Sequence, residues 1–319
     1  MDETGPRWIG PEEARAALRP ADCIAFVRQA MMALSAGETV QAPRTVLSLD
    51  GDNKFAAMAG ALAAGGWFGA KLVAVFADPQ HPGRQAHRGA VALFDGAGGR
   101  LVALADAEEI TIARTAAASA VATDALARAD ASVLAIFGTG AQAHAHVHAI
   151  ACVRRLERVV IWGRSADRAE ALAGRLRSET GLAVVAEASA GRAAAADILC
   201  TTTAATTPIL SGRFVPPGAH VNLVGSSRPG PVEIDTELLL AGRYIVDSRQ
   251  SALLEAAEFL AAKAAGVVGD GHIAAEIGEV LLGRAAGRRD DEEITLYKSL
   301  GHPVQDIAAA AFLHALGRP

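Results

Sequence analysis

The feature that most constrains the fold of this 319-residue chain is a glycine turn set between an apolar segment and a helical one. Residues 132–137 have the apolar pattern of a strand, and residues 141–153 have that of a helix. Between them, Gly138 permits a tight bend, Gly140 lets the backbone approach a pyrophosphate, and Ala143 keeps the helix close to the sheet. This G-x-G-x-x-A sequence in its strand–turn–helix context is typical of a nicotinamide or flavin dinucleotide site.

The segments that follow alternate between strand and helix patterns. A helix is predicted at 166–178, and strands are predicted at 158–162, 183–186, 197–201, 220–224 and 244–246. Such alternation indicates a doubly wound parallel sheet, so the expected fold class is α/β with a Rossmann-type domain. The last part of the chain, 294–316, is expected to be mostly helical and to pack back on the N-terminal part.

The N-terminal third has a different pattern. Residues 11–36 are helical in periodicity, and Pro20 is expected to divide them into a short helix and a longer one. Short apolar segments joined by tight turns then predict antiparallel strands at 45–49, 72–76, 91–94 and 101–104. A helix at 110–127 leads into the glycine turn, and the first domain is therefore expected to be α+β.

The end of the second predicted strand of the dinucleotide region bears on the choice of cofactor. Sites specific for NAD place an Asp or Glu there to hold the ribose hydroxyls, but this chain has Gly163, Arg164 and Ser165. Arg164 and Ser165 could bind a 2′-phosphate, so we expect NADP(H) to be preferred and NAD(H) to remain possible. Alternatively, Arg164 is a solvated turn residue and Ser165 caps the next helix.

Composition excludes several classes of protein. With 30 Lys and Arg against 35 Asp and Glu the net charge is −5 and no basic stripe is present, which argues against nucleic-acid binding. The longest apolar stretch, 131–153, is interrupted by the glycine turn and three histidines, which argues against a membrane span. The N-terminus lacks an apolar run, and the three cysteines are widely spaced, so we expect a cytoplasmic protein without disulfides.

Three histidines on the helix after the glycine turn raise the question of a metal. Only His144 and His148 share a helical face, His146 lies between them, and no H-E-x-x-H arrangement is present. We therefore expect solvated helix histidines and no metal.

Residues 110–120, Ile-Thr-Ile-Ala-Arg-Thr-Ala-Ala-Ala-Ser-Ala, resemble the T-x-x-R-T-A-A-x-S-A signature of the ornithine cyclodeaminase and mu-crystallin family. Further agreement runs along nearly the whole chain, at 43–44, 69–71, 138–142, 197–203, 224–229, Glu233, 247–248, 298–301 and Asp306. The resemblance implies a Rossmann domain at 118–299, inserted in a substrate-binding and dimerisation domain at 1–117 and 300–319. It also implies a homodimer and α-amino or α-imino acid substrates.

The same resemblance assigns the site residues. It implies that Arg44, Lys71, Arg114 and Leu300 bind the substrate, and the three cations are chemically suited to clamp a carboxylate. The implied cofactor contacts are Arg114, Thr115, Gly138, Gly140, Ala141, Gln142, Arg164, Ser165, Thr201, Val224, Gly225 and Ser299. For Ser299 and Leu300, a helix cap and a core contact are alternatives. Lys71 is the candidate for holding or delivering the substrate proton, and Ser227 is the second candidate catalytic residue.

One departure from the family pattern bears on the reaction. Cyclodeaminases carry V-G-G-D-x-P-G, whereas residues 224–230 here read Val-Gly-Ser-Ser-Arg-Pro-Gly, with Ser227 in place of the Asp. A serine hydroxyl is a poor general base near pH 7, so ornithine cyclodeamination is disfavoured. The turn resembles the ketimine-reductase branch of the family.

The expected activity is therefore NAD(P)H-dependent reduction of small cyclic α-imino acids. Δ1-pyrroline-2-carboxylate would give L-proline, and Δ1-piperideine-2-carboxylate would give L-pipecolate. Three alternatives stay open: an alanine- or arginine-type amino-acid dehydrogenase, an ornithine cyclodeaminase, and a non-catalytic protein that binds a small molecule.

Overall fold

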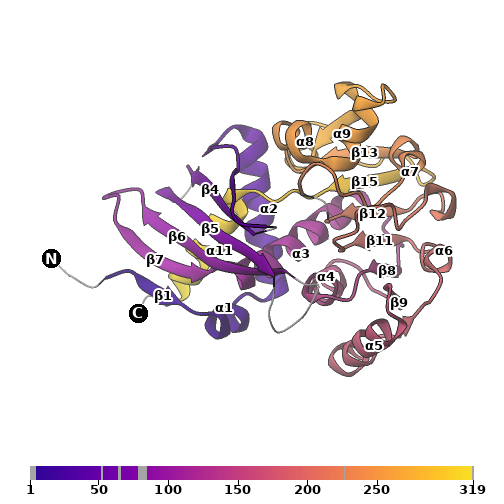
Figure 1. Cartoon of the computed structure of the whole chain (residues 1–319), viewed down its shortest axis with the longest axis horizontal. Coiled ribbons are helices and arrows are strands. Elements are labelled where there is room, and N and C mark those ends of the chain that lie inside the picture. The colour runs from indigo at the N-terminus through magenta and orange to yellow at the C-terminus, as the bar shows by residue number, and fades with distance from the viewer. Residues whose placement is uncertain (1–4, 52, 64–65, 78–84, 226, 318–319) are drawn as a thin grey trace. The chain divides into compact units, whose positions relative to one another are not determined.

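The computed structural model describes residues 5–51, 53–63, 66–77, 85–225 and 227–317. The chain forms two compact units, Met1–Arg114 with His302–Pro319, and Thr115–Gly301. Helix α3 (Ala107–Leu126) contains the boundary between the two units, and the last helix, α11 (Pro303–Leu316), belongs to the first (Figure 1).

The first unit is built on a seven-stranded sheet in the order β1-β7-β6-β5-β4-β2, with β3 also paired to β4. Every pairing is antiparallel except that of β1 with β7. Helix α11 packs across one face of this sheet, and α2 packs against α11 (Figure 1). The strands are β1 (Arg7–Ile9), β2 (Thr39–Gln41), β3 (Thr45–Ser48), β4 (Lys54–Leu62), β5 (Trp67–Ala77), β6 (Gln85–Asp95) and β7 (Leu101–Asp106).

Two local features of this unit follow from its sequence. The predicted break at Pro20 is confirmed, since α1 (Pro11–Ala17) ends before it and α2 (Pro20–Ala36) begins at it. Proline suits the first position of a helix because the N–H that it lacks has no intrahelical partner there. Strand β4 was not predicted, because its alanines and glycine have low strand propensity; its pairing with β5 along its whole length overrides that preference.

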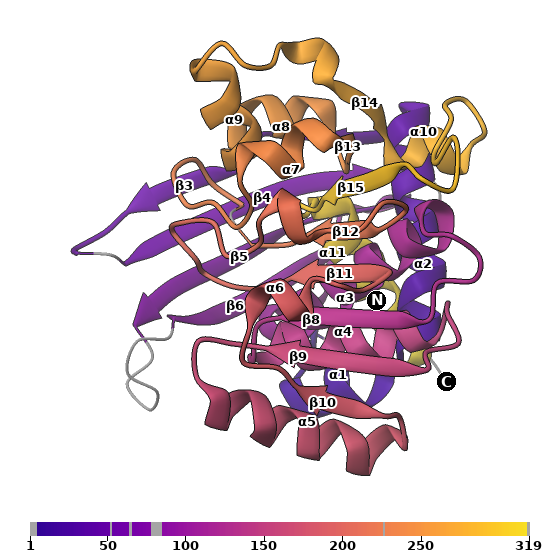
Figure 2. The same cartoon turned by 90° about the vertical axis from the view of Figure 1, so that its right-hand side faces the viewer.

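The second unit is a Rossmann-type domain, as expected. Its eight strands are parallel, in the order β10-β9-β8-β11-β12-β15-β13-β14, and Figure 2 shows this succession. The strands are β8 (Val133–Phe137), β9 (Arg158–Trp162), β10 (Val184–Ala186), β11 (Ile198–Thr201), β12 (His220–Leu223), β13 (Gly242–Val246), β14 (Ile273–Glu276) and β15 (Ile294–Lys298). The helices are α4 (Ala141–Ala151), α5 (Ala166–Thr180), α6 (Ala190–Ala193), α7 (Thr236–Ala241), α8 (Arg249–Glu255), α9 (Ala257–Ala264) and α10 (Ile277–Leu281).

The expectation of helix from residue 294 onward is wrong for the first part of that segment. Ile294–Lys298 forms β15, which lies between β12 and β13 in the sheet. The β-branched and aromatic residues Ile294, Thr295 and Tyr297 favour a strand, and Pro303 then starts α11. Within the described ranges, no helix is both long and apolar enough to cross a membrane.

Candidate active site

Lys71 lies in the middle of the first unit's sheet. It sits on β5, opposite Met58 of β4 and Val91 of β6, and both of these neighbours are buried. Alternation along the strand turns Lys71 to the buried face with Gly69 and Val73. The lysine side chain is therefore placed by a rigid strand, and only 4% of the residue is exposed.

A buried carboxylate on α11 joins Lys71 to Arg114. The Nε of Arg114 donates to Oδ1 of Asp306 at 3.0 Å, and Nζ of Lys71 lies 3.5 Å from the same oxygen. Arg114 also donates through Nη1 to Oε1 of Gln305 at 3.1 Å, and Lys71 donates to the hydroxyl of Thr111. The structure thus brings together two predicted substrate ligands and Asp306, which sequence reasoning named only as part of the family pattern.

The electrostatics of this cluster favour an anionic ligand. Burial lowers the pKa of Lys71 to about 8, the carboxylate of Asp306 opposes the shift, and the positive charges of Arg114 and Arg44 add to it. Arg44, in the loop between β2 and β3, is thus close enough to act on Lys71. Lys71 and Arg114 share one buried carboxylate and Arg44 adds a third positive charge near Lys71, so a bound carboxylate would offset part of this charge.

The glycine turn of the second unit has the geometry that a dinucleotide needs. Gly138 has φ of 142°, and a Cβ at this position would lie 2.4 Å from Oγ1 of Thr202. Its N–H donates to the carbonyl of Trp162 at 2.8 Å, which ties the turn to β9. Helix α4 begins directly after Gly140, and no side chain caps it. Its first turn, which includes Ala141 and Gln142, can therefore present N–H groups to phosphates.

At the end of β9, the adjacent residues Arg164 and Ser165 have different surroundings. Arg164 is exposed, whereas Ser165 is the N-cap of α5 and its hydroxyl accepts the N–H of Arg168 at 3.3 Å. The structure thus shows Ser165 in the alternative role, as the cap of the helix that follows. An exposed guanidinium with no carboxylate in the 163–165 turn is still compatible with a 2′-phosphate.

Buried charged residues surround Gly225. The Nζ of Lys298 donates to the carbonyl of Gly225 at 2.8 Å and lies 3.1 Å from Oε2 of Glu258. A Cβ on Gly225 would lie 2.5 Å from the carboxylate of Glu233, which itself accepts the N–H and hydroxyl of Thr203 at 2.7 Å each. Burial raises the pKa of Glu233, and its hydrogen bonds with Thr203 oppose the shift.

This second cluster involves several predicted cofactor residues. The hydroxyl of Thr201 donates to Oε2 of Glu233 at 2.7 Å, and the backbone carbonyl of Thr201 accepts the N–H of Val224 at 3.0 Å. Ser227 is half-buried in the turn that follows Gly225, and Ser226 lies outside the described residues. Sequence reasoning missed the supporting role of Lys298 and Glu258; a lysine at the end of the apolar run 294–297 is the signal that could have revealed it.

The last predicted contacts are buried. The side chain of Leu300 lies in the hydrophobic core of the second unit, and its N–H donates to Asp247 at 2.6 Å, so the core-contact alternative describes its position. Ser299 does not cap α11, because the N-cap of that helix is His302. The Ser299 hydroxyl is buried and has no hydrogen-bond partner within the described part of the chain. Thr115, next to Arg114 on α3, is also buried.

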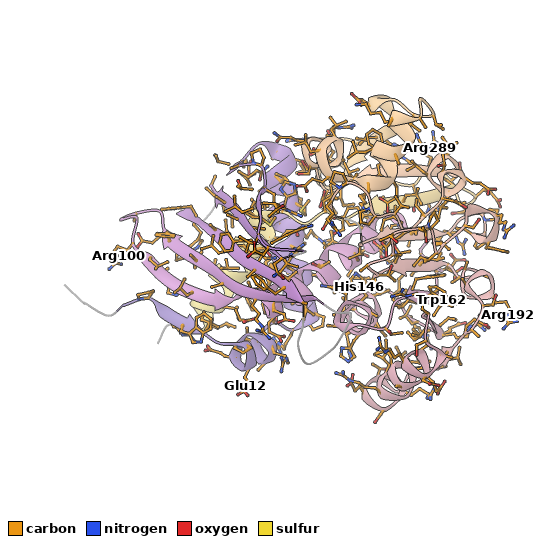
Figure 3. All side chains as sticks on the ribbon, viewed as in Figure 1. Glu12, Arg100, His146, Trp162, Arg192 and Arg289 are labelled. Carbon is orange, nitrogen blue, oxygen red and sulfur yellow. The ribbon has the colours of Figure 1, made fainter. Side chains whose placement is uncertain are left out.

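The expectation of solvated histidines is wrong for His146. Its ring is fully buried, with Nε2 2.9 Å from the hydroxyl of Ser119 on α3 and Nδ1 2.7 Å from the carbonyl of Gln142. Figure 3 labels His146 among the side chains. Burial lowers the pKa of His146 to about 4, so the ring is neutral at pH 7. The helical period explains the error, because His146 is two positions from His144 and from His148 and so lies on the opposite face of α4.

Comparison with known proteins identifies the family of the chain. The model of the ornithine cyclodeaminase/mu-crystallin family matches residues 12–316. A Δ(1)-pyrroline-2-carboxylate reductase of Bacillus cereus is 34% identical over 309 residues, which are 96% of this chain and 95% of that protein. The ketimine reductase mu-crystallin of Mus musculus is 37% identical over 245 residues, 76% of this chain and 74% of its own.

Solved structures extend the likeness to the whole fold. Thermococcus litoralis Δ(1)-pyrroline-2-carboxylate reductase, in complex with NADH and L-proline, aligns with a TM-score of 0.93 at 28% identity, covering 97% of this chain and 96% of that one. An archaeal alanine dehydrogenase dimer with bound NAD aligns with a TM-score of 0.91 at 27% identity, covering 97% and 95%. The chain belongs to the ornithine cyclodeaminase/mu-crystallin family.

Proposed function

We propose that the protein is an NAD(P)H-dependent reductase of cyclic α-imino acids, converting Δ1-pyrroline-2-carboxylate to L-proline and Δ1-piperideine-2-carboxylate to L-pipecolate. The observation that carries the proposal is the buried cluster in which Lys71 and Arg114 share the carboxylate of Asp306, while the positive charge of Arg44 acts on Lys71. Relatives that match nearly the full length and bear the name of pyrroline-2-carboxylate reductase support it.

In this mechanism the cationic cluster binds and polarises the substrate. Arg114 and Arg44 hold the substrate carboxylate, because a guanidinium matches the geometry of a carboxylate. Lys71, with a pKa of about 8, can donate a proton to the imine nitrogen near neutral pH. The buried Oδ2 of Asp306, which has no hydrogen-bond partner among the described residues, is available to accept the N–H of the iminium ion.

The reduced nicotinamide, when bound, supplies the hydride. That hydride would go to carbon 2 of the iminium ion and the C=N π electrons to nitrogen, which would keep its proton, so the product would be the neutral secondary amine of the amino acid. The turn at Gly138 and Gly140, with the first turn of α4, would hold the pyrophosphate. The rest of the cofactor site is proposed to be formed by Thr115, Thr201, Val224, Gly225 and Ser299.

NADP(H) is the proposed preferred cofactor. Arg164 is exposed at the end of β9, where an NAD-specific site would place a carboxylate. Ser165 already caps α5, so its contribution to a 2′-phosphate would be secondary.

The residue in the turn after β12 favours reduction over cyclodeamination. Ser227 replaces the aspartate of the cyclodeaminase pattern, and a hydroxyl cannot serve as a general base near pH 7. Reducing a preformed imine needs no such base. Ser227 would instead hydrogen-bond the substrate nitrogen or the cofactor carboxamide.

We also propose that the protein is a cytoplasmic homodimer paired through the sheet of the first unit. The face of β5 opposite Lys71 carries Phe68, Leu72 and Phe76, which are 38%, 40% and 40% exposed. Leu47 on β3 and Val40 on β2 add exposed apolar area to this sheet. Apolar faces of this kind mark interaction sites, and the archaeal alanine dehydrogenase, a relative of similar fold, is a dimer. Sedimentation equilibrium tests the assembly.

The decisive experiment is a substrate panel followed by the absorbance of the nicotinamide. We expect oxidation of NADPH, and more slowly of NADH, with Δ1-pyrroline-2-carboxylate and with Δ1-piperideine-2-carboxylate. Ornithine with NAD⁺ should release no ammonia, and pyruvate with ammonia should be reduced poorly. Turnover of ornithine, or of pyruvate in preference to the cyclic imines, would contradict the proposal.

A further inference from the structure

Two histidines of α4 and a glutamate of α5 bring three metal-binding atoms together in the second unit. His144 and His148 lie one helical turn apart on α4, and Glu179 lies near the end of α5. The Nε2 atoms of His144 and His148 are 2.6 Å and 3.1 Å from the same oxygen, Oε2 of Glu179. All three ligand atoms lie within 4.8 Å of one another.

These distances are close to those of a metal site. Bonds from Zn²⁺ to imidazole nitrogen and carboxylate oxygen are about 2.0–2.2 Å, so tetrahedral angles separate two ligand atoms by roughly 3.3 Å. The separations of 2.6 Å and 3.1 Å from Oε2 of Glu179, and the 4.8 Å limit for all three atoms, therefore require adjustments of at most about 1.5 Å in these separations to admit an ion. The side chains of His144, His148 and Glu179 are 23%, 31% and 34% exposed, which leaves the cluster open to ions and water.

A neighbouring arginine holds the carboxylate in the required orientation. The Nε of Arg175 donates to Oε1 of Glu179 at 2.7 Å, while Oε2 faces the two histidines. Partners of this kind orient a carboxylate ligand in metal sites. The glutamate thus has one oxygen fixed by α5 and the other directed at α4.

We propose that His144, His148 and Glu179 bind a divalent transition-metal ion, Zn²⁺, with water completing a tetrahedral set. Two imidazoles and one carboxylate suit Zn²⁺ better than Mg²⁺ or Ca²⁺, which prefer oxygen ligands alone. The ion links α4, the helix that starts at the glycine turn, to α5. The expectation of no metal considered only ligands within one helix, whereas Glu179 follows His148 by 31 residues.

Zinc titration of the full-length protein at pH 7.5, in competition with a chromophoric chelator, tests the site. One equivalent of Zn²⁺ should bind. His148→Ala and Glu179→Gln should each weaken binding by at least about tenfold, since loss of an outer-shell partner alone costs about 10–100-fold. Glu170→Gln is the matched control, because this other α5 carboxylate pairs with Arg177 and should leave zinc affinity unchanged.

Thermal unfolding gives a second readout that does not depend on enzyme activity. An ion that binds only the folded state raises the melting temperature, so ZnCl₂ should raise that of the wild type and Glu170→Gln more than that of Glu179→Gln. Equal zinc affinity in Glu179→Gln and the wild type would show chelation by the histidine pair alone and overturn the proposal. Failure of the wild type to bind zinc saturably would also overturn it.

Discussion

Each unit of the protein buries a lysine, and the two lysines have opposite surroundings. Lys71 lies 3.5 Å from the carboxylate of Asp306 and shares it with the positively charged Arg114. Lys298 lies 3.1 Å from the carboxylate of Glu258 and donates to the backbone carbonyl of Gly225 at 2.8 Å. Burial raises the pKa of the nearby Glu233, and the positive charge of Lys298 opposes that shift. Among the described residues, two arginines and one aspartate act on Lys71, whereas two glutamates lie near Lys298.

We interpret the cluster of Lys71 as a binding site and the cluster of Lys298 as a support. The carboxylate of Asp306 serves both Lys71 and Arg114, so we expect a substrate carboxylate to offset the remaining positive charge; burial leaves Lys71 with a pKa of about 8. The ammonium of Lys298 instead holds the backbone at Gly225, in the turn that leads to Ser227. The buried charges around Lys71 in the first unit are thus proposed to serve catalysis, and those around Lys298 in the second unit to hold the backbone in position.

Removing the ammonium of Lys71 should have the largest effect. Lys71→Met should lower kcat/KM for Δ1-pyrroline-2-carboxylate by about 10²–10⁴-fold, the usual loss for a general acid. Its melting temperature should stay near that of the wild type, because the substitution removes a desolvated charge and leaves Arg114 paired with Asp306. Steady-state kinetics and calorimetry measure the two quantities, and a folded Lys71→Met variant with near-normal turnover would remove Lys71 from the mechanism.

Lys298→Met should mainly lower the stability of the protein, whereas Lys71→Met should mainly lower its activity. The change leaves Glu258 buried without its cation, which typically costs about 3–5 kcal/mol of unfolding free energy. The double variant Lys298→Met with Glu258→Leu should recover part of this loss, since an apolar pair needs no counter-charge. Urea unfolding measures the stabilities. A single variant as stable as the wild type would contradict the supporting role.

The pH dependence of reduction should follow Lys71. A lysine with a pKa of about 8 is protonated below that pH and loses its proton above it, so kcat/KM should fall about tenfold per pH unit above pH 8. Lys71→Arg keeps its positive charge over this range and should lack that break. Profiles of both proteins with the same substrate separate titration of the enzyme from that of the imine; identical profiles would exclude Lys71 as the titrating group.

Arg164→Ala should have the smallest effect and should be selective. Loss of an exposed guanidinium should raise KM for NADPH by about tenfold, near the low end for a charge-assisted hydrogen bond, and change KM for NADH by about twofold or less. Equal losses with both cofactors would refute the proposed contact with the 2′-phosphate. Initial rates at saturating imine provide the comparison.

The sequence predicted the elements whose pattern is local. The strand, glycine turn and helix at 132–153 and the break at Pro20 follow from periodicity and from the backbone limits of glycine and proline. Strands β4 and β15 were missed or misread, because their place in a sheet depends on partners far along the chain.

The candidate site was predictable to a similar degree. The resemblance pointed to Arg44, Lys71 and Arg114, but no sequence pattern shows that Asp306 on α11 joins two of them. The pairing of Lys298 with Glu258 likewise depends on tertiary packing, as does the burial of His146 against Ser119. A sequence shows which residues are charged, whereas the fold decides which of these residues pair with one another.

Transfer of isotope from cofactor to product tests the central claim most directly. With NADPH deuterated at carbon 4 of the nicotinamide on the transferred face, Δ1-pyrroline-2-carboxylate should give L-proline with one deuterium at its α-carbon, detected by mass spectrometry and NMR. The Lys71→Met variant should form this product at least about a hundredfold more slowly. Oxidation of the cofactor without labelled proline, or no reaction with the cyclic imine at all, would contradict the account.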